Sequence, residues 1–420
     1  MTTEARPTLA TFPNRAGLQE AVLRLLGPPP HCNHRDEDGE PFHRYPYEIV
    51  WLVIDGGAVY LRAKGQGSLA VSVRVEGVEV AGQASAEFMI KAPLLAGAVA
   101  ALPDGALLLE HEEFKTDGWS IPFLRFTSVD TGSLACPVEQ MSEGPPLLQP
   151  CDPDFSISAA AWYRLHERVF SARGPGKANV KNEATHGVRV EIGPDVKMVA
   201  TDGHRIHADS CKTECVLTGH TMMLLPDDFC EAVGRLLKHH ANGLAKLTID
   251  YRQDSVVAEV AGDQVYRERK VGLVFPPYQE LIDKIEPRMP ALISAPLSTR
   301  TTVDYLERLL QHRPMAVVTL LLSKERLLFR SDWSTTVDFE ASGPSRTLDD
   351  VFYPAYEGEP RQVKVDARYL LEALRACGGT ATFLSIGEDA HDAVLVRGGQ
   401  FLAVIMPTKC DDTDPEFANH

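Results

Sequence analysis

The chain has 420 residues, of which 44% are hydrophobic and 24% are charged, as in an ordinary globular protein. At roughly 150 residues per domain this length predicts about three domains, and no apolar run approaches the ~18 residues that a membrane-spanning helix requires. The net charge of −16 argues against binding nucleic acid over the whole surface, but it leaves room for a local basic face.

The N-terminal sequence MTTEARPTLATFPNR lacks the apolar segment of a secretory signal, which predicts a cytosolic protein. The eight cysteines show no repeated CxxC spacing, so we expect reduced thiols and not a disulfide scaffold. Cys211 and Cys215 form the sequence CKTEC, and a second donor cluster surrounds Cys32. Neither is completed by another pair at zinc-site spacing, so we predict no metal and no other cofactor.

One block of sequence occurs three times, and each copy is typical of a strand, a short turn and a helix. The copies are MIKAPLLAGAVAALPDG, MMLLPDDFCEAVGRLLKHHANG and QVKVDARYLLEALRACGGT. Their turn residues Ala92, Pro226 and Ala367 are separated by about 134 and 141 residues, which is the length of a domain. The repeat therefore predicts three similar domains.

A companion block precedes each copy. It consists of an amphipathic helix, near residues 18–25, 165–169 and 303–310, followed by strands with tight turns in YLRAKGQGSLAVSV, KMVATDGHRIHADS and LLFRSDWSTTVDFE. Each domain would then contain two helices and roughly eight strands. The predicted fold class is α+β, with the helices packed on antiparallel sheets.

Two Pro-rich stretches, PVEQMSEGPPLLQPCDPD and KIEPRMPALISAPLS, are typical of domain boundaries. We place the three domains at residues 1–145, 146–287 and 288–410. Residues 411–420 form an acidic C-terminal tail.

Basic residues gather on one face of several predicted helices. Arg235, Lys238 and His239 share a face opposite the apolar side of their helix. Arg164 and Arg168 likewise share one face of their helix, as do Arg368 and Arg375. This pattern fits either an ordinary solvated face or a surface for a nucleic acid backbone.

Residues 199–206 spell VATDGHRI, in which Asp-Gly predicts a tight turn between two strands. One interpretation makes Asp202 and His204 the acid and base of a small-molecule hydrolase. Residues two apart on a turn do not by themselves form a proton relay, and no Ser or Cys nucleophile signature accompanies them. We therefore predict a protein that is not an enzyme.

VATDGHRI resembles the ATDGHRL signature in the middle domain of the bacterial DNA polymerase III beta subunit, the beta sliding clamp family. Two further stretches agree in order and spacing. Phe275-Pro276-Pro277-Tyr278 resembles the family's FPDY segment, and FLAVIMP at residues 401–407 resembles its closing YVVMP. The resemblance covers essentially the whole chain and is weakest in the first domain.

The resemblance implies a DNA clamp fold of three repeated domains and a homodimer closed head to tail into a ring. Helices would line a channel for double-stranded DNA, and sheets would form the outside. Such a processivity factor tethers the replicative DNA polymerase to its template. Its partners, which include the polymerase, the clamp loader and repair proteins, insert a short peptide between the second and third domains.

The positions that match the family's peptide pocket are aliphatic, Met, Pro or turn residues. They are Thr201, Gly203, His204, Arg205, Ile206, Pro276, Leu281, Val404, Met406 and Pro407. Apolar surface of this kind suits the anchors of a short peptide, and methionine adapts to varied partners.

The chain departs from the family pattern near this pocket. Glu280 stands where a basic residue is usual, Thr408 replaces an apolar residue, and the acidic tail extends the chain. These departures favour an alternative, a clamp paralogue from a mobile element or a resistance locus with altered partner binding.

A closed ring stays on DNA by topology, so its own contacts with phosphates can be weak and independent of sequence. The residues predicted to make them are Arg44, Arg173, Lys177, Lys181, Arg235 and Lys238. For the dimer interface we expect apolar surface around Phe126 and Leu310 at the two ends of the subunit.

Overall fold

A computed structural model places most of the chain. It describes residues 8–28, 45–82, 85–102, 104–116, 119–128, 132–139, 144–146, 148–174, 185, 187–212, 216–217, 222–240, 244–269, 272–285, 299–314, 316–322, 327–331, 336–337, 361–378, 383–387 and 391–408. These residues form two compact units. Unit 1 comprises Met1–Tyr163, Glu214–His220 and Asp228–Val271, and unit 2 comprises Arg164–Thr213, Thr221–Asp227 and Gly272–His420.

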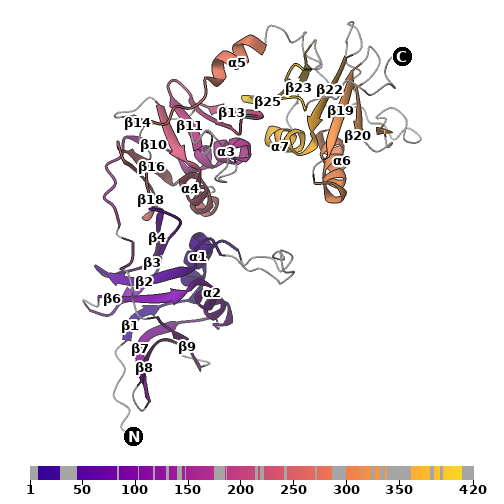
Figure 1. Cartoon of the computed structure of the whole chain (residues 1–420). Coiled ribbons are helices and arrows are strands. Elements are labelled where there is room, and N and C mark those ends of the chain that lie inside the picture. The colour runs from indigo at the N-terminus through magenta and orange to yellow at the C-terminus, as the bar shows by residue number, and fades with distance from the viewer. Residues whose placement is uncertain are drawn as a thin grey trace. The chain divides into compact units, whose positions relative to one another are not determined.

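Unit 1 contains two antiparallel sheets (Figure 1). The smaller has the strand order β5 (Glu79–Val80), β1 (Thr8–Phe12), β7 (Leu107–Thr116), β8 (Trp119–Ser128) and β9 (Gly132–Pro137). The larger has the order β14 (Val216–Leu217), β10 (Phe155–Ser158), β16 (Lys246–Tyr251), β17 (Ser255–Val260), β18 (Asp263–Glu268), β4 (Ala70–Val75), β3 (Ala58–Lys64), β2 (Ile49–Asp55) and β6 (Ala86–Lys91).

Unit 2 is built in the same way. Its seven-stranded sheet has the order β15 (Met222–Pro226), β11 (Gly187–Ile192), β12 (Val196–Thr201), β13 (Arg205–Cys211), β25 (Phe401–Ile405), β24 (Val394–Gly398) and β23 (Phe383–Ile386). Its four-stranded sheet has the order β21 (Thr336–Val337), β20 (Leu327–Ser331), β19 (Val317–Leu322) and β22 (Arg361–Asp366).

The helices follow the predicted repeat. The repeated block appears as β6 followed by α2 (Ala92–Ala101), β15 followed by α4 (Asp227–His240), and β22 followed by α7 (Ala367–Cys377). The companion helices are α1 (Arg15–Leu26), α3 (Ala159–Val169) and α6 (Thr299–His312). The prediction of an α+β chain with a recurring strand-helix block is therefore confirmed, while the domain boundaries at 145 and 287 stay a prediction.

Local chemistry explains where these helices begin and end. Asn14 caps α1 by accepting a hydrogen bond from the Gly17 amide, and Asp366 caps α7 by accepting one from the Arg368 amide. Gly378 ends α7 in the left-handed conformation, with φ of 67°, which a glycine adopts without steric cost.

Two elements were not predicted. The short helix α5 (Tyr278–Ile285) follows FPP at the end of the second predicted domain, and a single 3-10 turn, η1 (Phe170–Ala172), extends α3. Eight residues between proline-rich segments carry too few turns for a clear apolar period. Both elements contribute to the site described below.

Both compact units contain a sheet that joins strands from different predicted domains. In unit 1, β18 pairs with β4, which aligns Val265 with Val71. In unit 2, β13 pairs with β25, which aligns Ile206 with Val404. Backbone hydrogen bonds therefore run continuously from one predicted domain into the next.

Alternating residues of β25 face two different cores. Ala403 and Ile405 belong to a buried cluster with α7, whereas Val404 belongs to a cluster with Phe275 and Tyr278 beside α5. The seven-stranded sheet is thus covered on one face by α7 and on the other by α5.

No helix among the described residues is long and apolar enough to cross a membrane.

A buried ion pair ties α1 to the β17–β18 hairpin within unit 1. The Arg24 guanidinium donates to the Asp263 carboxylate at 2.7 Å, and their side chains are 3% and 0% exposed. Asp263 also accepts the Arg74 amide at 2.9 Å and lies 3.2 Å from His240 Nε2. Removing one partner of such a pair leaves a charge in the protein interior.

We predict that Arg24→Ala lowers the free energy of unfolding by about 3 kcal/mol, the low end for breaking a buried pair, because Arg74 and His240 still support Asp263. Urea denaturation would measure it. The control is Lys91→Ala, since Lys91 and Glu139 are 54% and 41% exposed and their pair should contribute less than about 1 kcal/mol. Equal losses in the two variants would contradict the assignment.

Candidate functional site

Three segments that are distant in sequence meet in unit 2: the β12–β13 turn, the C-terminal end of β25, and α5. β13 and β25 form an antiparallel pair, and beyond it the Met406 amide donates to the His204 carbonyl at 2.8 Å. Tyr278 and Ile282 of α5 pack against Ile206 in one apolar cluster. The structure thus brings together the three sequence motifs that were matched to a peptide pocket.

The β12–β13 turn is held by its own side chains. The Asp202 carboxylate accepts the amides of His204 at 2.9 Å and of Arg205 at 3.0 Å. The Thr201 hydroxyl donates to the Arg205 carbonyl at 2.6 Å and accepts the Gly203 amide at 3.1 Å. Gly203 has φ of 88°, a left-handed conformation that explains why the turn uses glycine.

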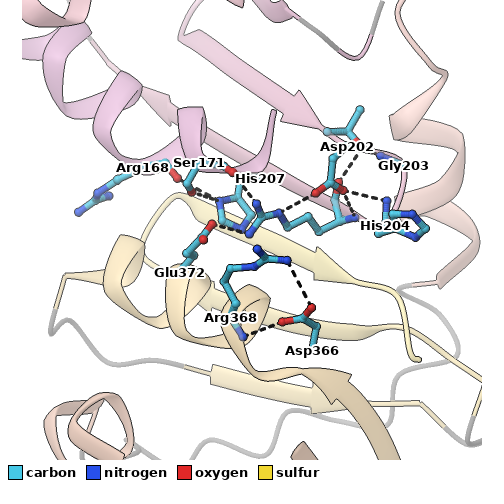
Figure 2. A network of polar contacts seen from close by, with 11 residues as sticks. Arg168, Ser171, Asp202, Gly203, His204, His207, Asp366, Arg368 and Glu372 are labelled. Atoms are coloured by element: carbon cyan, nitrogen blue, oxygen red, sulfur yellow. Dashed lines mark hydrogen bonds and ion pairs between the residues drawn. The ribbon is translucent and has the colours of Figure 1, made fainter. Parts of the chain in front are cut away.

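Figure 2 shows a polar network at this turn that includes Asp202, Ser171 and Glu372. The Arg205 side chain donates to all three residues. Its Nε donates to Asp202 at 3.1 Å, its Nη2 donates to the Ser171 carbonyl at 2.5 Å, and its Nη1 donates to Glu372. The guanidinium also lies 4.2 Å from the centre of the Tyr369 ring. All three nitrogens of Arg205 are therefore engaged inside the chain, and its side chain is only 7% exposed.

This geometry gives the Asp202 side chain a structural role and leaves the His204 imidazole without a carboxylate partner among the described residues. Asp202 binds the backbone of its own turn and Arg205, and it contacts the amide of His204 and not the imidazole (Figure 2). The His204 side chain is exposed. A hydrolase would need the imidazole aligned with a carboxylate and a third group, so the arrangement does not support that alternative.

His207 lies beside the same network, and no sequence motif indicated a role for its side chain. Its Nδ1 donates to the Arg168 carbonyl at 3.2 Å, and its ring meets Phe401 edge-on with centres 5.3 Å apart. Its Nε2 has no hydrogen-bond partner among the residues that the structure describes. Burial, with a smaller effect of the Arg205 charge, lowers the pKa of His207 from 6.5 to about 3, so the ring is neutral.

The predicted pocket residues differ in what they can offer a partner. Ile206 and Val404 are only 6% and 1% exposed, so they form the floor of the site and not its contact surface. Met406 is 36% exposed, and Pro276, Leu281 and Pro407 are partly exposed.

Two exposed apolar residues were missed. Leu273 and Val274 are 38% and 80% exposed and directly precede Phe275, which is buried in the cluster beside α5. The apolar run LVF before the two prolines was the available signal. Exposed side chains of this kind next to a groove are typical of an interaction surface.

A surface pocket of about 390 Å³ lies beside the start of α5, lined by Arg189, Glu191, Pro277, Tyr278, Gln279 and Glu280. The Tyr278 hydroxyl donates to Glu191 at 3.0 Å, and burial followed by this carboxylate raises the pKa of Tyr278. None of the ten predicted peptide-binding residues lines this pocket, although Pro276 and Leu281 flank its lining residues in sequence.

The predicted DNA-binding residues fall into three groups. Lys238 is exposed on α4, on the side away from the buried Phe229, Val233 and Leu237, as predicted. Arg173 and Arg235 are half-buried: Arg173 lies 3.9 Å from the centre of the Phe170 ring, and Arg235 pairs with Glu231 at 3.7 Å.

The predictions for Arg44, Lys177 and Lys181 fall outside the described residues, as do those for residues 411–420. Among the residues that the structure does describe, no group of three or more His, Cys, Asp or Glu side chains could hold a metal ion.

One prediction about the dimer interface needs correction. Phe126 on β8 is 0% exposed because it faces the core of unit 1, so its side chain presents no apolar surface to a second subunit. β9, next to β8, is the last strand of that sheet and leaves an edge instead. Leu310 on α6 is partly buried against the core cluster of α7. The dimer itself stays a prediction.

Comparison with solved structures finds the same fold in bacterial DNA sliding clamps. The DNA polymerase sliding clamp of Pseudomonas aeruginosa matches with a TM-score of 0.66 and 17% identity over 96% of this chain and 100% of that one. The DNA polymerase III beta subunit of Thermotoga maritima matches with a TM-score of 0.70 and 16% identity over the same shares.

The sliding clamp of Caulobacter crescentus matches with a TM-score of 0.69 and 16% identity, again over 96% of this chain and 100% of that one. No protein-family model matches the sequence, and no curated protein matches it. The likeness to the solved structures confirms the predicted clamp fold along nearly the whole chain.

The burial of His207 predicts a pH dependence of stability. Between its folded pKa of about 3 and its ordinary value of 6.5, the unfolded chain binds a proton that the folded chain does not. The free energy of unfolding should therefore fall as the pH drops through this window, by up to ~1.4 kcal/mol per pH unit from this residue.

His207→Asn keeps a donor side chain but removes the titrating group, so we predict a flatter dependence. Urea denaturation of both proteins at several pH values below 6.5 would measure the difference in slope. Identical slopes would show that another group controls acid stability.

Proposed function

We propose that this protein is a DNA sliding clamp, a subunit without catalytic activity that encircles double-stranded DNA and tethers a DNA polymerase to it. The carrying observation is the clamp fold, which aligns with 96% of this chain and with the whole of the compared clamp chains. The compared structures are described as DNA polymerase sliding clamps or DNA polymerase III beta subunits.

In this proposal two copies associate head to tail, and the edge strands at the two ends of the subunit pair across the interface. Unpaired strand edges are a ready template for such pairing. A ring stays on DNA because it cannot leave without opening, so strong phosphate contacts are unnecessary. This makes the net charge of −16 compatible with a DNA-encircling protein.

We further propose that partner proteins insert a short peptide between the β12–β13 turn, the end of β25 and α5. Met406, Leu273 and Val274 would contribute exposed apolar surface, above a floor of Ile206 and Val404. Partners of this kind would include the polymerase, a clamp loader and repair proteins. The protein would act in the cytosol, where these partners and the DNA are found.

The alternative function, a clamp paralogue, differs from the main proposal in the partner proteins that the chain would bind. Glu280 is exposed at the start of α5 and lines the pocket there, so an acidic group stands beside the proposed peptide site. A clamp of this kind would keep the ring and select a different peptide.

We predict that the protein increases the length of DNA that its cognate polymerase synthesises in one binding event on primed circular DNA, in the presence of a clamp loader. Met406→Asp should abolish this effect and weaken peptide binding more than tenfold, because it places a charge among apolar anchors. Fluorescence polarisation with a labelled clamp-binding peptide and a primer extension assay would measure the two effects.

The matched control is Met222→Asp, which changes another exposed methionine, on the edge strand β15. It should bind the peptide as the unchanged protein does, and light scattering should find both variants as dimers. Full peptide affinity in Met406→Asp would show that partners dock elsewhere.

We also predict that Lys238→Glu lowers the affinity for linear duplex DNA and reduces the slope of log affinity against log salt by about one, because at least one phosphate contact is lost. Lys284→Glu is the control, with the same charge change at an exposed lysine of α5. An equal effect of both substitutions would mean that overall charge, and not a contact at α4, governs binding.

A further inference from the structure

We infer that Glu372 is a positioning residue of the proposed peptide site, and that it acts by holding Arg205 in place beneath the β12–β13 turn. The inference rests on the proposed function. Glu372 lies on α7, and its carboxylate accepts a hydrogen bond from Arg205 Nη1.

The Arg205 side chain donates hydrogen bonds to three residues, and each bond links the β12–β13 turn to a different part of unit 2 or to itself. Asp202 belongs to the same turn, three residues away, so its bond to Arg205 only closes the turn on itself. The Ser171 carbonyl comes from η1, and Glu372 comes from α7. The bond to Glu372 is thus the ion pair that ties the turn to the helix on the far side of the sheet.

The surroundings make this pair stronger than an ordinary surface pair. The Arg205 and Glu372 side chains are 7% and 24% exposed, so water screens their attraction only weakly. The Tyr369 ring, one turn before Glu372 on α7, lies beneath the guanidinium and restricts its position further. Without Glu372, the Asp202 carboxylate would be the one charged partner left to Arg205 in this network. The Arg205 side chain would then adopt other conformations more readily.

The network also limits the hydrogen bonds that Arg205 can form with a partner protein. Its charge is shared between the Asp202 and Glu372 carboxylates, and each of its nitrogens already donates within the chain. A partner's carboxylate would have to displace one of these bonds. Arg205 therefore shapes the turn, and the partner meets the exposed Gly203 and His204 instead.

A turn that is held in one conformation binds a peptide without first having to order itself. If only a fraction of the molecules has the competent turn, the apparent dissociation constant rises by the inverse of that fraction. Glu372 should therefore affect peptide affinity without touching the peptide, and it should affect the dynamics of the turn in the free protein as well.

The test compares Glu372→Gln with Glu307→Gln. Glu307, on α6, pairs with Arg375 of the same helix α7 at 2.6 Å, but both side chains are well exposed, at 37% and 55%. We expect Glu372→Gln to weaken binding of the labelled clamp-binding peptide by about five- to tenfold, and Glu307→Gln to leave it unchanged. Glu372→Asp keeps the charge and should restore part of the affinity.

Amide hydrogen exchange of the free proteins separates positioning from general destabilisation. Exchange in residues 201–206 should become faster in Glu372→Gln, while exchange in the rest of unit 2 stays as it is. Unchanged exchange in the turn, unchanged peptide affinity, or faster exchange throughout unit 2 would each overturn the inference.

If the unchanged protein does not bind the peptide, the proposed function fails at this site. Exchange in the turn then still decides whether Glu372 holds Arg205. The two failures can therefore be told apart.

Discussion

The pairing of β13 with β25 is the interaction on which the rest of the site depends. It places Ile206 beside Val404 and carries the backbone hydrogen bonds from the middle of the sequence to its C-terminal end. Because residues of a strand alternate between faces, the same pairing directs Ala403 and Ile405 towards α7 and Val404 towards α5. The turn, the terminal segment and α5 are adjacent only because this register is kept.

The polar chemistry of the site serves the same geometry. Asp202, Arg205 and Glu372 would suggest an active site if they were judged by residue type alone, but their hydrogen bonds run to backbone groups and to one another. His207 is structural as well, because its buried, neutral ring donates to the Arg168 carbonyl. A rigid frame under an exposed, partly apolar surface suits the recognition of a peptide better than catalysis.

Much of the fold could be predicted because each repeated block is a strand and a helix that are adjacent in sequence. In QVKVDARYLLEALRACGGT, for example, the spacing of the apolar residues indicates both α7 and the strand before it. Long-range details could not be predicted. The bond from Arg205 to Glu372 spans 167 residues, and no local pattern indicates it. The apolar character of Phe126 indicated burial, but it could not distinguish burial in its own core from burial in an interface.

The proposed function requires a closed ring around DNA, and its most direct test compares retention of the protein on circular and on linear DNA. The labelled protein is loaded onto a nicked circular plasmid by a cognate clamp loader with ATP, and it is followed by gel filtration at a salt concentration that suppresses phosphate contacts. A ring should elute with the circular DNA and be released when a single cut makes the plasmid linear. Equal retention before and after the cut, or none on circular DNA that the loader has engaged, would contradict the account.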